Sequence, residues 1–204
     1  MITVVDYGLG NIRAFENIFR ALGITVQSAR NAEELAKANK IILPGVGAFD
    51  WAIQSLHQSG MTTVLNKLVL EERIPVLGVC VGMQIMANSS EEGHLSGLGW
   101  IDAEVKKFDI SLLNQRPHLP HMGWNDVRPE KSCSLFRDIE DPRYYFLHSY
   151  YLKPNNPKDV AAYSTYGVEF ASAIASQNIF ATQFHPEKSH KWGAQLLKNF
   201  EELC

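Results

Sequence analysis

Cys80 stands where a protein chain could hold a nucleophile. Residues 78–84 read Gly-Val-Cys-Val-Gly-Met-Gln and follow the apolar run 74–77, which predicts a strand, a sharp turn and a helix. Such a turn strains the backbone of the central residue, and its flanking glycines leave room for close packing and for a substrate. Taken alone, Cys80 could also be a buried, inert thiol on a tight turn.

A thiol nucleophile needs a base and a group that orients the base. Residues 183–189 read Gln-Phe-His-Pro-Glu-Lys-Ser after an alternating run, which predicts a strand that ends at His185, just before a proline. Side chains two apart in an extended segment point to the same side, so we expect His185 and Glu187 to share a face and to pair. The alternative is an ordinary solvated pair at a polar strand end.

A glycine-rich segment could supply the remaining part of the chemistry. The apolar run 40–43 leads into residues 44–49, Pro-Gly-Val-Gly-Ala-Phe. Glycines on both sides of Val46 allow a peptide to turn its N–H toward a ligand, so backbone N–H groups of Val46, Gly47 and Val81 are candidates for an oxyanion hole. Phosphate binding is the competing interpretation. It is weak, because no third glycine of a dinucleotide site and no Lys-Ser/Thr pair follows.

The composition is that of a globular protein of ordinary polarity. The 204 residues are 46% hydrophobic and 20% charged, with a net charge of -3, which favours one domain spanning 1–204. This charge gives no reason to expect a nucleic acid or a membrane as a partner. Three cysteines, at 80, 133 and 204, argue against a disulfide framework and for a reducing, cytoplasmic compartment.

The elements expected around these motifs alternate between strand and helix. Strand 2–5, a helix capped by Asn11, strand 24–26, a short helix capped by Asn31, and helices 49–57 and 62–72 precede the Cys80 strand. This order predicts an α/β protein with a mostly parallel sheet, helices on both faces and Cys80 at the carboxyl end of a strand. From 100 to 183, short strands and turns predict antiparallel additions. Ser189 is expected to cap the last helix.

Several of these motifs together resemble a known family. Residues 44–47, 78–84 and 183–189 resemble the class I, or triad, glutamine amidotransferases. Residues 6–11 (Asp-Tyr-Gly-Leu-Gly-Asn), 120–125 (Pro-His-Met-Gly-Trp-Asn) and 145–150 (Tyr-Phe-Leu-His-Ser-Tyr) are similar to segments of the glutaminase subunits of imidazole glycerol phosphate synthases. The resemblance extends from residue 1 to about residue 200 and implies the flavodoxin-like amidotransferase fold.

The resemblance also implies roles for particular residues. Cys80, His185 and Glu187 would form the catalytic triad that hydrolyses glutamine to glutamate and ammonia, with no cofactor. Gln84, Ser149 and Tyr150 would hold the amino-acid portion of the glutamine.

A partner follows from the same resemblance. The ammonia would pass to a (βα)₈ cyclase in a heterodimer, forming imidazole glycerol phosphate and AICAR in histidine biosynthesis. Asn11, Trp124, Tyr145 and Lys188 would contribute to the docking rim.

Other functions stay open at this point. Val79, Val81 and Trp100 depart from the residues usual in the family, and close paralogues of its members supply ammonia for sugar amidation in surface polysaccharides. Further alternatives are a flavodoxin-like cysteine hydrolase and a non-catalytic regulatory subunit. His118 and His121 bracket Pro120, which argues against a helix that would align them, so no metal site is expected.

Overall fold

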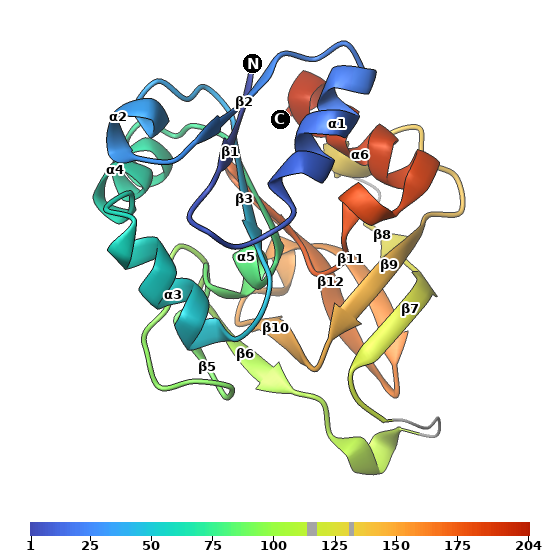
Figure 1. Cartoon of the computed structure of the whole chain (residues 1–204). Helices are drawn as coiled ribbons and strands as arrows, with labels where there is room; N and C mark the ends of the chain where they lie inside the picture. The colour runs from blue at the N-terminus through green and yellow to red at the C-terminus, as the bar shows by residue number, and fades with distance from the viewer. Residues whose placement is uncertain (114–117, 131–132) are drawn as a thin grey trace.

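The computed structural model describes residues 1–113, 118–130 and 133–204. Within these ranges, the strands of an eight-stranded central sheet follow the order β2-β1-β3-β4-β13-β12-β11-β8 (Figure 1). Their bounds are β1 Ile2–Val5, β2 Val26–Ala29, β3 Ile41–Gly45, β4 Val76–Cys80, β8 Arg128–Pro129, β11 Val160–Tyr166, β12 Val168–Ser176 and β13 Ile179–Thr182.

The sheet has a parallel part and an antiparallel part. Strands β2, β1, β3, β4 and β13 pair in parallel, and β12, β11 and β8 continue the sheet antiparallel. Strands β1, β3, β4 and β13 are buried along their whole length, as apolar runs covered by helices on both sides should be. The predicted fold class is therefore confirmed.

Helices cover both faces of the sheet. The helices are α1 Ile12–Ala21, α2 Ala32–Leu35, α3 Phe49–Gln58, α4 Thr62–Asn66, α5 Val81–Gln84 and α6 His190–Leu203. Figure 1 shows α1 and α6 together on one side, and α2, α3 and α4 on the other. Shorter turns are a π-helical turn at Lys67–Glu71 and 3₁₀ turns at Ile110–Leu112, Ser134–Phe136, Pro157–Asp159 and Pro186–Lys188. No helix in the described ranges is long and apolar enough to cross a membrane.

Two of the three predicted helix caps are confirmed, and the third is wrong. The side chains of Asn11 and Asn31 accept hydrogen bonds from the N–H groups of Ala14 and Glu34, which satisfies free donors of the first turn. Ser189 precedes α6, but its side chain makes no capping bond. Its hydroxyl instead donates to the His185 carbonyl at 2.6 Å. The predicted strand 24–26 lies later, at β2.

The antiparallel additions differ from the expectation, because part of them forms two small separate sheets. One contains β5 (Ser89–Ser90), β6 (Ala103–Lys107) and β10 (Tyr150–Pro154), and the other contains β7 (His121–Asp126) and β9 (Arg143–His148). Strand β9 passes next to the end of the parallel strands, where Tyr145 forms a bridge with His185. The small sheets thus bring residues of the second half of the chain to Cys80.

Candidate active site

Cys80 occupies a strained position between β4 and α5. Its backbone has φ 56° and ψ −112°, which non-glycine residues rarely adopt. The glycines on either side are required by packing: a Cβ on Gly82 would overlap the Leu43 carbonyl, and one on Gly78 would lie 2.6 Å from the terminal methyl of Met86. The predicted strand, turn and helix are therefore present, although α5 ends after four residues.

His185 and Glu187 form a buried pair. Nδ1 of His185 lies 2.8 Å from Oε1 of Glu187, so the expected contact is present. The expected reason for it is wrong, because Pro186–Lys188 is a 3₁₀ turn and not an extended segment. The turn is held by Ser189, whose hydroxyl donates to the His185 carbonyl and accepts from the Tyr145 N–H at 3.0 Å.

The surroundings of His185 favour its protonated form. Burial alone would lower the pKa of His185, but hydrogen bonds with Cys80 and Glu187, together with their negative charges, raise this pKa to about 10. Because Glu187 binds Nδ1, Nε2 is the ring nitrogen available for a hydrogen bond with Cys80. The arrangement can hold an imidazolium beside a thiolate, and it can give and take a proton there.

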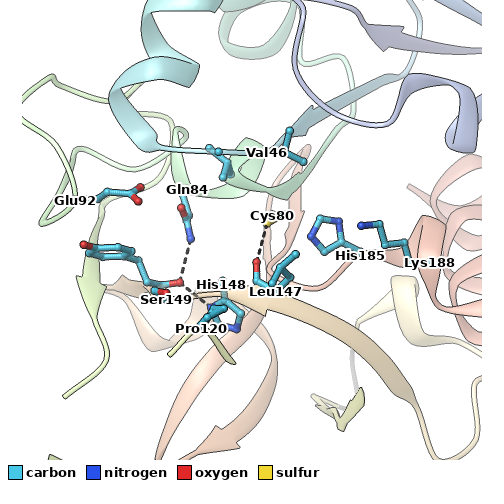
Figure 2. A pocket seen from close by; sticks show the side chains of 13 residues that line it. Val46, Cys80, Gln84, Glu92, Pro120, Leu147, His148, Ser149, His185 and Lys188 are labelled. Carbon is cyan, nitrogen blue, oxygen red and sulfur yellow. Dashed lines mark hydrogen bonds between the residues drawn. The ribbon is translucent and has the colours of Figure 1, made fainter. Parts of the chain in front are cut away.

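A cavity of about 270 Å³ opens over Cys80. Most of the predicted site residues line it, namely Val46, Gly47, Cys80, Val81, Gln84, Ser149, Tyr150, His185 and Lys188. Figure 2 shows Val46 above Cys80, with Gln84 on one side and His185 on the other. Glu187, which binds His185, is not part of the lining, and neither are Asn11, Trp124 and Tyr145.

The candidate oxyanion segment is tight at its start and open at its end. Gly45 pairs with Cys80 across β3 and β4, and a Cβ on Gly45 would overlap the Gly82 backbone. Gly47 has φ +92°, and a Cβ there would meet no atom within 4 Å. Val46 thus stands between a packed glycine and an open one, and it is itself exposed.

The side-chain amide nitrogen of Gln84 is hydrogen-bonded within the protein. Its Nε2 donates to the Tyr150 carbonyl at 3.0 Å (Figure 2) and to Oε1 of Gln183 at 3.1 Å. Both N–H groups are therefore in use, and the amide oxygen is the part of Gln84 left for a ligand. Substrate binding by Gln84 stays a prediction, and in this arrangement only its amide oxygen is available for it.

Sequence reasoning missed Glu92 and Gln183. Glu92 lines the cavity, and its Oε2 accepts from the Phe49 N–H at 2.9 Å. Its carboxylate suits the ammonium group of an amino acid, but its segment has no distinctive spacing. Gln183 lies in the quoted motif, and its Nε2 approaches Sγ of Cys80 at 3.9 Å.

A buried pair of histidines supports the far wall of the cavity. Nδ1 of His148 lies 2.7 Å from the Tyr150 carbonyl, and its Nε2 lies 2.9 Å from Nδ1 of His121. Nε2 of His121 in turn lies 3.2 Å from Nδ2 of Asn125. Burial lowers the pKa of His148 to about 3 and that of His121 to about 4, so both rings are neutral at pH 7. The Tyr150 carbonyl can only accept, so Nδ1 of His148 carries its proton and Nε2 of His148 accepts from the Nδ1–H of His121. Nε2 of His121 then accepts from the amide of Asn125.

Three of the four predicted rim residues lie together. Trp124 and Tyr145 are cross-strand partners on β7 and β9 with ring centroids 6.4 Å apart, and Nζ of Lys188 lies 5.8 Å from the Tyr145 ring centroid. Asn11 lies at the start of α1, which packs against the turn that carries Lys188. Exposed apolar side chains of Met122 and Leu147 continue this surface.

Comparisons with known proteins agree with this geometry. The family model "Glutamine amidotransferase class-I" matches residues 3–203. The chain is 53% identical over 204 residues to the imidazole glycerol phosphate synthase subunit HisH of Bdellovibrio bacteriovorus, and 49% identical to that of Leptospira interrogans, with all of each protein covered. The chain belongs to the class I glutamine amidotransferases.

Solved structures of this amidotransferase fold are similar along the whole chain. A crystal structure of a glutamine amidotransferase superposes with a TM-score of 0.75 at 20% identity, covering 99% of this chain and 97% of that one. The structure of PurLQS from Thermotoga maritima gives a TM-score of 0.73 at 16% identity, covering 98% of this chain and 96% of the matched one. At these identities the likeness concerns the fold alone.

Proposed function

We propose that this amidotransferase is the glutaminase subunit of an imidazole glycerol phosphate synthase. It hydrolyses glutamine to glutamate and ammonia, and a (βα)₈ cyclase uses the ammonia to form imidazole glycerol phosphate and AICAR in histidine biosynthesis. Full-length identity of 53% and 49% to two HisH subunits supports the pathway. The observation that carries the chemistry is that His185, paired with the buried Glu187, lines one cavity with Cys80.

Cys80 is the nucleophile and His185 the proton carrier in this proposal. Sγ of Cys80 attacks the side-chain carbonyl carbon of glutamine and forms a C–S bond. The C–N bond then breaks, and the imidazolium of His185 gives its proton to the departing ammonia. Water next attacks the thioester and passes a proton to His185 as the C–S bond breaks and glutamate leaves. Glu187 keeps Nδ1 of His185 bound throughout.

The cavity walls supply the remaining interactions. Backbone N–H groups of Val46 or Gly47 and of Val81 stabilise the oxyanion of each tetrahedral intermediate. Ser149, Tyr150 and the Gln84 oxygen hold the amino-acid end of glutamine, and the Glu92 carboxylate receives its ammonium group. Their positions in the lining support these roles.

The cyclase docks on the surface formed by Met122, Trp124, Tyr145, Leu147 and Lys188. This surface borders the cavity, since Leu147 and Lys188 also line it, and an exposed apolar patch beside a site marks an interface. The heterodimer works in the cytoplasm, where reducing conditions keep the Cys80 thiol usable. Residues 1–204 act as one domain in it.

The decisive experiment compares two nitrogen sources. Cys80→Ala is expected to abolish synthase turnover with glutamine and to leave turnover with ammonium at alkaline pH unchanged, because the thiol serves only to release ammonia. Cys133→Ala is the matched control, since this half-buried cysteine lies outside the cavity lining, and it should retain both activities. Glutamine-dependent turnover by Cys80→Ala near the wild-type rate would overturn the assignment. Rescue of a histidine auxotroph that lacks this subunit tests the pathway.

A further inference from the structure

Tyr7 lies in the loop between β1 and α1 and reaches the start of the oxyanion segment. Its side chain is buried, and its hydroxyl donates to the Pro44 carbonyl at 2.7 Å. Proline has no N–H, so this carbonyl is the one main-chain hydrogen-bonding group of Pro44. The ladder between β1 and β3 ends at Val4 and Ile42. At Pro44, two residues after Ile42, the Tyr7 hydroxyl is the donor to the carbonyl in place of a main-chain N–H.

Other contacts hold the same point of the chain. Gly10 has φ +98°, and a Cβ there would lie 2.7 Å from Cβ of Pro44. On the other side, Gly45 packs against the backbone of Gly82 in the nucleophile turn. The chain is therefore fixed up to Gly45 and becomes open at Gly47.

The Tyr7 hydroxyl keeps its proton under working conditions. Burial raises its pKa above the ordinary tyrosine value, and negative charge on Cys80 raises it further. The group therefore remains a donor when Cys80 is a thiolate. The anchored carbonyl lies near the nucleophile, because Pro44 and Gly45 pair with Val79 and Cys80 across β3 and β4.

We propose that Tyr7 is a positioning residue for glutamine hydrolysis: its hydroxyl anchors the Pro44 carbonyl, so that only the peptides after Gly45 rotate to present an oxyanion donor. The inference rests on the proposed function, because it assigns a cause to the geometry of that oxyanion hole. Tyr7 itself touches no substrate. It acts by fixing where the rotating part of the segment begins.

Tyr7→Phe tests the inference in the complex with the cyclase and its nucleotide substrate. The variant removes one oxygen and retains the packing of the ring. We expect kcat for glutamine to fall roughly tenfold or more while KM changes less than about twofold, because the oxyanion forms after binding. Ammonia-dependent turnover and alkylation of Cys80 by iodoacetamide, which has no oxyanion step, should not change. Amide exchange at residues 45–47 should become faster.

Tyr144→Phe is the matched control. Tyr144 is also buried and donates its hydroxyl to a main-chain carbonyl, that of Trp192 at 3.4 Å, but this carbonyl belongs to α6 and not to the oxyanion segment. Its kcat should equal that of the wild type, and melting temperatures confirm that both variants fold. A kcat of Tyr7→Phe within twofold of the wild type, or an equal loss in Tyr144→Phe, would overturn the role of Tyr7. Activity retained by Cys80→Ala would instead overturn the proposed function.

Discussion

Nδ1 of His185 lies 2.8 Å from Oε1 of Glu187, and the two side chains are only 4% and 3% exposed. The carboxylate thus holds one face of the imidazole in a site with little water. This leaves Nε2 for Cys80 and stabilises positive charge on the ring. The geometry therefore ties the protonation of His185 to the charge of two neighbours, one on each side.

The first prediction concerns the protonation of His185 after loss of the thiol. The pKa of His185 is raised to about 10, against the effect of burial, by hydrogen bonds and charge from Cys80 and Glu187. Cys80→Ala removes the contribution of Cys80, so the pKa of His185 should fall. NMR titration of the imidazole in both proteins measures the change. An unchanged or higher pKa in the variant would mean that Cys80 and His185 are not coupled.

The second prediction compares the losses of kcat caused by two substitutions. His185→Asn should reduce kcat more than Glu187→Gln, because His185 moves protons in both half-reactions whereas Glu187 orients it. Loss of a general acid–base group costs on the order of 10²–10⁴-fold. Glutamine kinetics of both variants in the complex measure the two losses. Equal or reversed losses would show that the roles are assigned wrongly.

Local chain geometry explains which features of the site could be predicted. Gly78 and Gly82 flank Cys80 because packing excludes any Cβ there. The two glycines in the sequence therefore predict the sharp turn at Cys80. Extended geometry predicts the His185–Glu187 pair, although a 3₁₀ turn produces it.

The other features depend on contacts between distant segments. Glu92 enters the cavity through a loop whose residues carry no pattern, and β2 lies later than its apolar residues suggested. Ser189 has the residue type of a helix cap, but its hydroxyl accepts from the N–H of Tyr145 on β9 and donates to the His185 carbonyl. Tertiary packing decides such positions, and a single sequence does not encode them locally.

The third prediction is a loss of stability in acid caused by the buried histidine pair. The folded pKa values of His148 and His121, about 3 and about 4, lie below the unfolded value of ~6.5. The unfolded state therefore binds more protons between these values, and stability falls as pH falls below ~6.5, by at most about 1.4 kcal/mol per pH unit for each histidine.

Urea unfolding between pH 7 and pH 5 measures this dependence. His121→Gln removes one titrating group, so its stability should decrease less steeply with falling pH than that of the wild type. His57→Gln, on α3 and away from the pair, is the control and should keep the wild-type slope. A wild-type slope in His121→Gln would show that His121 is not a source of the acid sensitivity.

The fourth prediction concerns docking of the cyclase. Trp124 is 38% exposed beside Met122 at 62%, and truncation of an aromatic anchor at an interface typically costs more than about 1 kcal/mol. Trp124→Ala should therefore weaken heterodimer affinity by roughly fivefold or more. Trp51→Ala is the control, because Trp51 is 54% exposed but lies on α3, away from this surface. Calorimetric affinities that fall equally for both variants would place the interface elsewhere.

The last prediction concerns activity without the partner. Free ammonia is mostly ammonium at neutral pH, and an unpartnered glutaminase would waste glutamine, so the isolated chain should be nearly inactive. The expected cause is a segment at Val46 and Gly47 whose N–H does not yet face the oxyanion, since the open surroundings of Gly47 permit such a rotation.

Cyclase with its nucleotide substrate should then raise kcat more than it lowers KM, because the missing donor acts in the transition state. A Gly47→Ala variant sharpens this test. Gly47 has φ +92°, a conformation that disfavours alanine, so the substitution should bias the rotation and change the ratio of partnered to unpartnered kcat. Steady-state glutaminase assays of both proteins, with and without cyclase and nucleotide, measure that ratio. Full activity of the isolated wild-type chain would refute the gating role of this segment, because its donor would then already be in place.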